Sequence, residues 1–341
     1  MRKFSLLILT SLLLITAEAQ DPNFSQFFVS PLTLNPALTG KFNGDFRVAG
    51  NYRDQWPSIS KAFITSTVSF DMPIMRSRLS ELDTWAVGLL AMTDKTANGI
   101  WSTNLISLTT AYHKGLDEDG LHQIGVGFQG TYNTQRLDGT KLNFEDELDQ
   151  FGGWSNPTEE VTINDRELNL SYFDVSAGVL YNGSTDGYNN FYIGASAYHL
   201  NKPKASFTGD IYYTLAQRYT VHAGGAIPLG DATRTIYISS LYSHQYGANN
   251  IVVGGAVGFA LNDEPDNPAN FYAGMWTRFN NVNDAIIPYV GLEFNGFRIG
   301  ASYDVNISAL KTASQSRGGL EVSLIFIKRP PGYKSMPCPR F

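Results

Sequence analysis

The chain of 341 residues is rich in aromatic side chains and glycine but poor in charge, with 13% aromatic and 16% charged residues. Its net charge of −6, with no long basic run, makes nucleic acid a poor partner. The one cysteine, Cys338, excludes an internal disulfide framework. The mean hydropathy of −0.16 argues against a helical membrane protein but is compatible with half-apolar barrel strands.

Residues 1–19 predict an export signal. A basic start at residues 2–3 precedes an apolar run at 4–15, which is too short to cross a bilayer as a helix. Small residues at 17 and 19 suit a cleavage site, so we expect the mature chain to begin at Gln20. No cysteine follows the cleavage site, so no lipid anchor is expected there.

Residues 20–44 precede the first predicted strand and match neither helix nor strand periodicity. They contain three prolines and an Asn-Pro turn signal at 35–36. An ordered cap or plug and an unstructured leader both fit this composition. The motif residues of this segment are Asp21, Pro22, Phe24, Gln26, Pro31, Asn35 and Pro36.

Residues 45–327 predict about fourteen antiparallel strands, most of them long enough for the ~9–11 residues of a tilted membrane strand. Apolar and polar side chains alternate along several of them, so each strand has one apolar face. The predicted strands lie near 45–56, 60–71, 83–93, 100–114, 121–134, 171–182, 190–200, 217–227, 233–244, 249–261, 270–279, 285–295, 296–307 and 317–327.

The clearest strand signal is a hairpin around the Asn-Gly pair at 295–296, which suits a type I′ turn. Across this turn Phe294 faces Phe297 and Glu293 faces Arg298, so one face is apolar and the other is charged. Glu293 and Arg298 are predicted to pair across the strands. Alternatively, they line a pathway for a solute.

Two architectures present one apolar face per strand, a soluble sandwich and a membrane barrel. Sandwich strands are usually shorter, about 5–6 residues. Long strands, the export signal and the lack of amphipathic helices to cover the apolar faces favour an all-β, transmembrane antiparallel barrel in the outer membrane. An even strand count puts both ends in the periplasm, and the longest loops, 135–170 and 201–216, both fall on the outer side.

Residues 328–341 form a proline-rich tail with four basic and no acidic residues. Proline favours an extended backbone, so this periplasmic tail suits a partner-binding segment. A disordered remnant is the alternative. The tail residues proposed for partner binding are Pro330, Pro331, Tyr333, Pro337, Cys338, Pro339, Arg340 and Phe341.

Signals for catalysis or metal binding are weak. None of the five histidines has metal-site spacing, and we expect hydrogen-bonded structural imidazoles. No motif singles out a nucleophile, so no catalytic residue, metal or cofactor is predicted. Glu145, Asp146, Glu147 and Asp149, with Asp138 nearby, suit Ca²⁺ by ligand type but lack the EF-hand order, and a solvated loop is the stronger interpretation.

Short motifs also run in a characteristic order along the chain. Near the start they are Gln20-Asp21-Pro22, Phe24-Ser25-Gln26, Pro31-Leu32, Asn35-Pro36-Ala37 and Gly40. Further along they are Asn51-Tyr52-Arg53, Gln55-Trp56, Leu142-Asn143-Phe144, Asp146, Phe191-Tyr192-Ile193-Gly194, His199-Leu200-Asn201-Lys202-Pro203, Arg218-Tyr219, His222-Ala223-Gly224, Ser302-Tyr303-Asp304-Val305-Asn306, Ser308, Leu310 and Gly319-Leu320-Glu321. In this order they resemble the PorP/SprF family of outer-membrane proteins attached to the type IX secretion system of Bacteroidetes.

The resemblance implies a barrel without known enzymatic activity. Family members work with secreted or surface-displayed proteins, including gliding adhesins, and with periplasmic ring or peptidoglycan-linked parts of the machine. We therefore expect a barrel that docks or anchors a secreted surface protein through loops 135–170 and 201–216. The tail at 328–341 is expected to contact periplasmic type IX components. A small-solute channel or transporter is the alternative function, and an outer-membrane hydrolase is a third.

Overall fold

The structure is a computed structural model that describes residues 21–57, 63–160, 163, 166–207, 212–230, 233–262, 269–280, 282–309 and 311–329. The predicted export signal and the tail residues from Pro330 onward lie outside the described residues.

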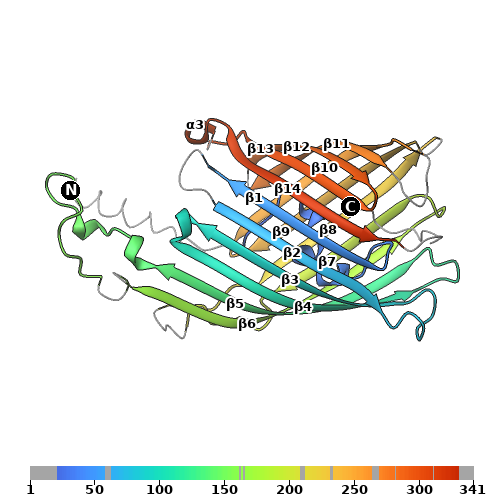
Figure 1. The fold of residues 1–341 in the computed structure, drawn as a ribbon, viewed down its shortest axis with the longest axis horizontal. Coiled ribbons are helices and arrows are strands. Elements are labelled where there is room, and N and C mark those ends of the chain that lie inside the picture. Colours follow the sequence, from blue (N-terminus) through green and yellow to red (C-terminus); the bar gives the residue numbers. More distant parts are fainter. Residues whose placement is uncertain are drawn as a thin grey trace, which may run out of the picture.

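Within the described residues, fourteen antiparallel strands close into one barrel, in which β1 pairs with β14 (Figure 1). The predicted barrel class is therefore confirmed. The strands are β1 (Phe46–Gln55), β2 (Phe63–Ile74), β3 (Thr84–Thr96), β4 (Trp101–Gly115), β5 (Gln123–Asp138), β6 (Glu167–Gly183), β7 (Asn190–Tyr198), β8 (Arg218–Leu229), β9 (Arg234–Gln245), β10 (Ala248–Ala260), β11 (Asn270–Asn280), β12 (Val282–Phe294), β13 (Phe297–Asn306) and β14 (Arg317–Lys328). Short helices η3 (Ala97–Gly99), η4 (Gly139–Lys141), η5 (Glu145–Glu147) and α3 (Lys311–Ser314) lie in loops.

The β12–β13 hairpin has the register that its sequence predicts. Phe294 faces Phe297, and Glu293 faces Arg298. The turn residues at 295–296 both have positive φ, 51° and 78°, as a type I′ turn requires. The two phenylalanines are about 40% exposed, 42% and 38%, while Glu293 is buried. The apolar face therefore points outward and the charged face points into the barrel.

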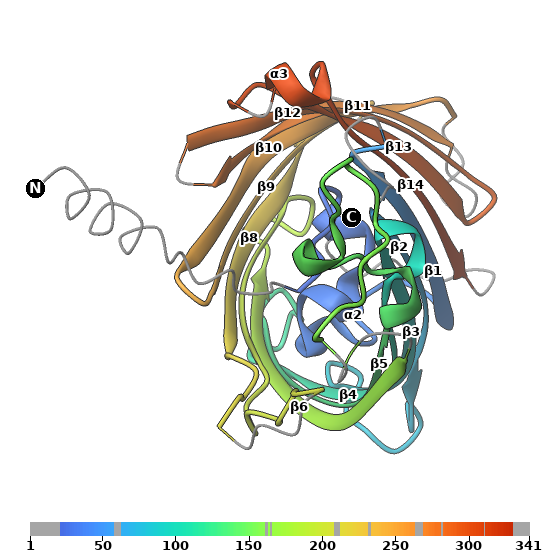
Figure 2. The same cartoon turned by 90° about the vertical axis from the view of Figure 1, so that its left-hand side faces the viewer.

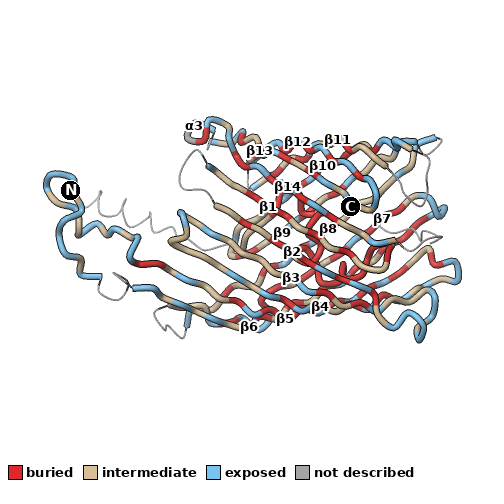
Figure 3. The backbone as a smooth tube through the Cα atoms, in the orientation of Figure 1, coloured by how far each residue is buried: buried red, intermediate tan, exposed pale blue. Residues whose placement is uncertain are grey.

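The same alternation holds around the wall, where buried and exposed residues alternate along the strands (Figure 3). On β5, for example, Phe128 is exposed on the outside and Gln129 is buried inside. The large exposed side chains of the outer wall are mainly aliphatic and aromatic, as lipid contact requires. Among the described residues, no helix has both the length and the apolar character needed to span a bilayer.

β5 and β6 are longer than their sequences indicated, and they project beyond the other strands (Figure 1). The loop between them is therefore 139–166 rather than 135–170. Alternation continues into this projection, but its outward residues, such as Arg136 and Asn169, are polar. On β6 the inward residues of this projection, Leu168 and Leu170, are apolar, so the polar and apolar faces are reversed relative to the membrane part of the strand. This reversal masked the strand pattern. The end of the barrel that carries this loop is called the outer end below.

Residues 21–44, called the plug below, lie inside the barrel (Figure 2). They form three single-turn helices, η1 (Phe27–Val29), α2 (Pro31–Leu34) and η2 (Pro36–Leu38). Proline occupies an early position of α2 and η2, where its fixed φ suits a helix start and no N–H is needed. Turns this short leave no periodicity in the sequence.

Candidate functional site in the barrel lumen

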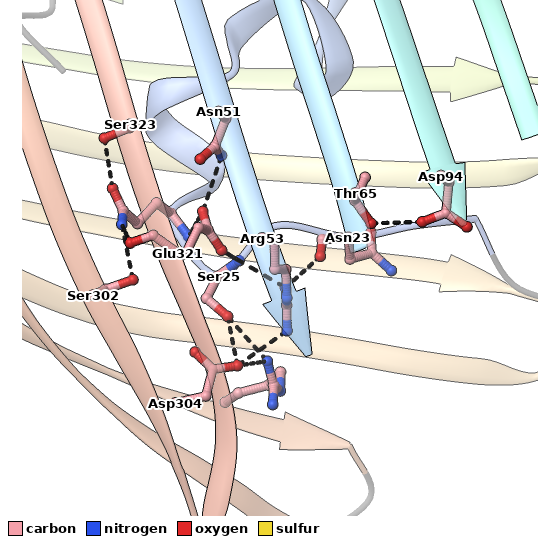
Figure 4. Close-up of polar contacts among 12 residues, drawn as sticks. Asn23, Ser25, Asn51, Arg53, Thr65, Asp94, Ser302, Asp304, Glu321 and Ser323 are labelled. Carbon is pink, nitrogen blue, oxygen red and sulfur yellow. Dashed lines mark hydrogen bonds and ion pairs between the residues drawn. The ribbon is translucent and has the colours of Figure 1, made fainter. Parts of the chain in front are cut away.

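The plug is fastened at the seam where the first and last strands close the barrel. The backbone N–H groups of Ser25 and Gln26 donate to the carboxylate of Glu321 on β14, at 2.9 and 3.0 Å. Arg53 on β1 is the register partner of Glu321, and its guanidinium donates to the carbonyl of Asn23 (Figure 4). Both sides of the seam therefore bond to the same short stretch of the plug, residues 23–26.

The side chain of Gln26 is bonded at both of its polar ends. Its amide nitrogen donates to the Ser302 hydroxyl at 2.8 Å, and its amide oxygen accepts from the Ser323 hydroxyl at 3.0 Å (Figure 4). Gln26 is only 1% exposed. A buried amide with both ends satisfied has one favoured orientation, so Gln26 fixes the plug against β13 and β14.

Asp304 on β13 is the centre of a buried ionic cluster. Its carboxylate accepts from Arg53 at 3.0 Å, from Arg278 on β11 at 2.8 Å and from the Ser25 hydroxyl at 2.8 Å. All four residues are buried. A buried charge is tolerated only where partners surround it, so this cluster couples the plug to three strands.

A glycine-lined surface receives the 35–37 turn of the plug on the opposite wall. A Cβ at Gly127 on β5 would lie 2.4 Å from the backbone of this turn, and one at Gly178 on β6 would lie 1.9 Å from the amide oxygen of Asn35. The Asn35 amide nitrogen also donates to Nε2 of His222 on β8, at 3.0 Å. Because of this close approach, larger residues at either glycine would displace the turn.

At the inner end, Asp71 on β2 joins the plug to the wall. Its carboxylate accepts two bonds from the Arg47 guanidinium, at 2.9 and 2.8 Å, and one from the Gly40 N–H at 2.7 Å. Arg47 also donates to the Leu38 carbonyl at 3.1 Å. A two-pronged arginine–carboxylate pair is geometrically specific, so this contact fixes the exit of the plug toward β1.

At the outer end, Asp21 contacts His199 at 2.9 Å and Arg218 at 3.3 Å, and His199 contacts Asp174 at 3.1 Å on its other nitrogen. Burial alone would lower the pKa of His199, but the carboxylates of Asp21 and Asp174 outweigh it and raise the pKa to about 9. The imidazole is therefore protonated at neutral pH and holds both carboxylates.

A cavity of about 470 Å³, called the vestibule below, lies above the plug at the outer end. Leu90, Met92 and Leu105 give it an apolar wall, and the Asp21–His199 pair lies on its polar side. The loop after β7 reaches this cavity's rim, where the rings of Phe207 and Trp101 meet edge to face at 5.1 Å. The vestibule can hold a small molecule or a few side chains, with both apolar and charged contacts.

Comparison with known proteins decides the family. Residues 16–326 match the family described as "Type IX secretion system membrane protein PorP/SprF". The chain belongs to the PorP/SprF family. It is an outer-membrane β-barrel protein of the type IX secretion family, as its sequence predicted. No curated protein matches it significantly.

Among solved structures, similar folds occur in other outer-membrane barrels. The crystal structure of a Pseudomonas aeruginosa FadL homologue has 10% identity and a TM-score of 0.45, covering 86% of this chain and 92% of that one. The CymD monoaromatic hydrocarbon channel has 9% identity and a TM-score of 0.46, covering 89% and 93%. BamA from Haemophilus ducreyi lacking POTRA domains 1–3 has 11% identity and a TM-score of 0.41, covering 84% and 71%.

The N-terminal motif residues of this PorP/SprF chain lie in the lumen. Phe24, Pro31 and Pro36 are buried among the plug turns, and Pro22 lines the vestibule. Asp21, Gln26 and Asn35 make the bonds described above. The structure brings all seven motif residues into one plug.

Glu293 and Arg298 form an ion pair at 3.0 Å inside the barrel. Glu293 also accepts from the Tyr272 hydroxyl at 2.5 Å and from the Arg329 guanidinium at 3.0 Å. Arg329 belongs to residues 328–341, which the sequence predicts as a tail. The chain therefore still contacts the barrel one residue beyond β14, and residues 330–341 lie outside the described residues.

The acidic loop is organised by its own hydrogen bonds. Asp149 accepts from the N–H groups of Phe151 and Gly153, both at 2.8 Å. Asp146 accepts from the Glu159 N–H, a bond that lowers the pKa of this carboxyl. In the described part of the chain, no three histidine, cysteine or acidic side chains converge as a metal site would require.

Sequence reasoning missed the residues that receive the plug. His113 and His222 look like ordinary strand residues, yet His113 donates to a plug carbonyl at 3.0 Å and His222 accepts from Asn35. Asp71, Asp304 and Glu321 also contact the plug. The available signal was the number of inward-facing charges on strands, which exceeds what cross-strand pairs alone can satisfy.

Proposed function

We propose that this PorP/SprF protein is a non-enzymatic scaffold that docks or anchors a secreted surface protein at its outer end. Its tail, 328–341, contacts periplasmic type IX components. The main support is the plug, which bonds to Glu321 on β14 and to His222 on β8. A lumen filled by its own chain suits a fixed docking scaffold better than an open passage.

The outer end offers the docking region. β5 and β6 project beyond the other strands and carry the acidic loop 139–166, while the vestibule opens beside them. These features are placed on a rigid wall, which keeps a binding surface in a defined position.

Two deletions test the proposal in producing cells. Loss of the whole chain should release the secreted surface protein into the medium. Removal of residues 330–341, which spares the Arg329–Glu293 contact, should leave the barrel folded and abolish co-purification of periplasmic type IX components. A flexible Gly-Ser tail of equal length is the control. Unchanged surface retention without the chain would overturn docking, and unchanged co-purification would overturn the tail's role.

The vestibule favours a second candidate, a channel or transporter for a small solute, because it combines apolar and charged walls. The plug bonds disfavour it. Single-channel conductance in planar bilayers separates the two functions, since a scaffold with a bonded plug should give little or no current. A large steady conductance from the wild-type chain would favour the channel.

A further inference from the structure

β6 loses its neighbour halfway along its length. β5 pairs with β6 from Glu167 to Asn182, but β7 pairs with it only from Ala177 to Gly183. Among the described residues, no strand pairs with the outer half of β6, residues 167–176, on the side away from β5. The barrel wall therefore has a free strand edge at its outer end.

The chain leaves this edge through a specific turn. His199, directly after β7, has φ of +58°, and the next N–H, of Leu200, donates to the Val175 carbonyl at 2.9 Å. The Asn201 side chain then accepts from the Val175 N–H at 3.1 Å and donates to the Phe173 carbonyl at 2.7 Å. The amide of Asn201 thus takes the place of a strand peptide group and ends the ladder there.

These bonds show which alternate residues of β6 direct their backbone groups toward the free edge. Val175 and Phe173 direct backbone groups away from β5, and this direction alternates along a strand. Ser171, Asn169 and Glu167 therefore also direct their N–H and C=O groups to the free side. No described residue outside the strands forms a backbone bond to them there. Such a row of unpaired groups is a template for an added strand.

The adjoining loop does not follow the edge. From Asn201 it turns inward, and its Phe207 ring contacts Trp101 at the start of β4, a residue that lines the vestibule. The outward residues near the edge also change from apolar to polar, from Phe173 to Ser171 and Asn169. The polar part of the edge suits contact with water rather than with lipid acyl chains.

The surroundings indicate what would pair here. Loop 139–166, which begins and ends beside this edge, holds seven acidic and two basic residues. The inward side chains of the free half, Leu168, Leu170 and Tyr172, are partly buried toward the lumen, and Tyr172 lines the vestibule. An added strand would place every second side chain over this apolar surface. Its remaining side chains would lie near the negative charges of the acidic loop.

We propose that residues 167–173 of β6 form a strand-addition site for an extended, cationic segment of the secreted partner protein. This inference rests on the proposed docking function and names its contact surface. The ion pairs at the outer end support this site, because the Asp21–His199–Asp174 cluster fixes the turn at which β7 separates from β6. The plug thereby helps to keep the edge free.

A binding experiment with defined probes tests the site on the full mature chain in lipid nanodiscs. The probe is a short peptide of alternating lysine and valine, and the charge control replaces lysine by glutamate. Ser171→Pro removes one edge N–H, and Ser171→Ala keeps it. We expect the lysine peptide to bind wild type and Ser171→Ala, and to bind Ser171→Pro about tenfold more weakly. Asn169→Pro should act like Ser171→Pro.

Three results would overturn the proposal. The first is equal binding of the lysine peptide to wild type and Ser171→Pro, or no binding to wild type. The second is equal binding of the glutamate peptide. The third is a wild-type dimer that Ser171→Pro dissociates, because the edge would then pair with a second copy of this chain.

A cell experiment separates this inference from the proposed function. If loss of the whole chain releases the surface protein but Ser171→Pro retains it, docking stands and the β6 edge is not its site. If neither change releases it, the docking function itself fails. Release by Ser171→Pro but not by Ser171→Ala is the expected result.

Discussion

The lumen and the outer half of β6 differ in whether their polar groups have bonding partners within the chain. Around Asp304 in the lumen, charged groups are buried and each has partners from the plug or from another strand. Along 167–171 of β6, a row of backbone groups has no described partner on one side. In the first region the chain supplies all of the bonding partners itself, whereas in the second region backbone groups are left for another chain to bind. The comparison suggests that the plug stabilises the barrel while the projecting edge serves recognition.

The largest effect is expected from Asp304→Asn, which leaves the guanidiniums of Arg53 and Arg278 beside a neutral group. Breaking a buried pair costs about 3–5 kcal/mol, so the free energy of unfolding in detergent, measured by urea titration, should fall by about that amount. Asp45→Asn is the matched control, because its pair with Arg76 is exposed and should contribute below about 1 kcal/mol. Equal losses of unfolding free energy from the two variants would show that the buried cluster stabilises the protein no more than an exposed ion pair does.

The second effect concerns pH at the outer end of the plug. His199 has a pKa raised from 6.5 to about 9, so its protonation stabilises the folded chain fully below about pH 6.5 and is lost as pH rises through about 9. The difference in unfolding free energy between wild type and His199→Gln should shrink by about 3 kcal/mol across this window. A difference that stays constant with pH would contradict the ionic role of His199.

The third effect tests the glycine-lined surface. Gly178→Val places a side chain where the amide of Asn35 lies, so we expect the plug to shift and the unfolding free energy to fall by about 2 kcal/mol. Faster proteolysis within residues 21–44 would report the shift. Gly99→Val is the control: a Cβ there meets nothing within 4 Å, although its positive φ adds local backbone strain that leaves the plug in place. Plug proteolysis unchanged by Gly178→Val would contradict a close-fitting turn.

The smallest effect on stability is expected at the free edge. Ser171→Pro removes an N–H that has no described strand partner, so the unfolding free energy should change by less than about 0.5 kcal/mol. Leu170→Pro removes an N–H directed at β5 and should cost about 1–3 kcal/mol. Similar losses from both variants would show that the edge is covered by this chain itself.

Much of the wall was predictable because strand periodicity is a local signal. The turn at 295–296 and its flanking alternation set the register of β12 and β13, and the count of about fourteen strands followed from the same pattern. The outer parts of β5 and β6 escaped prediction because their outward residues there are polar, so the apolar outer face that marks the rest of the wall is missing. The plug turns escaped it because single-turn helices have no period.

The lumen contacts could not be predicted from local sequence, because each joins residues far apart in the chain. Ser25 meets Asp304, and Asn35 meets His222. Their side chains are compatible with many partners, and only closure of the barrel selects one. The motif residues of 21–36 were identified from sequence, but their bonding partners were not.

The sequence by itself determined an exported barrel with an apolar exterior, because a two-residue repeat and a type I′ turn fix which side chains share a face. Only the tertiary structure decided that residues 21–44 fill the lumen and that β7 leaves β6 at His199. Both depend on closing the sheet, which brings β1 to β14 and confines charges where partners must be found within the chain.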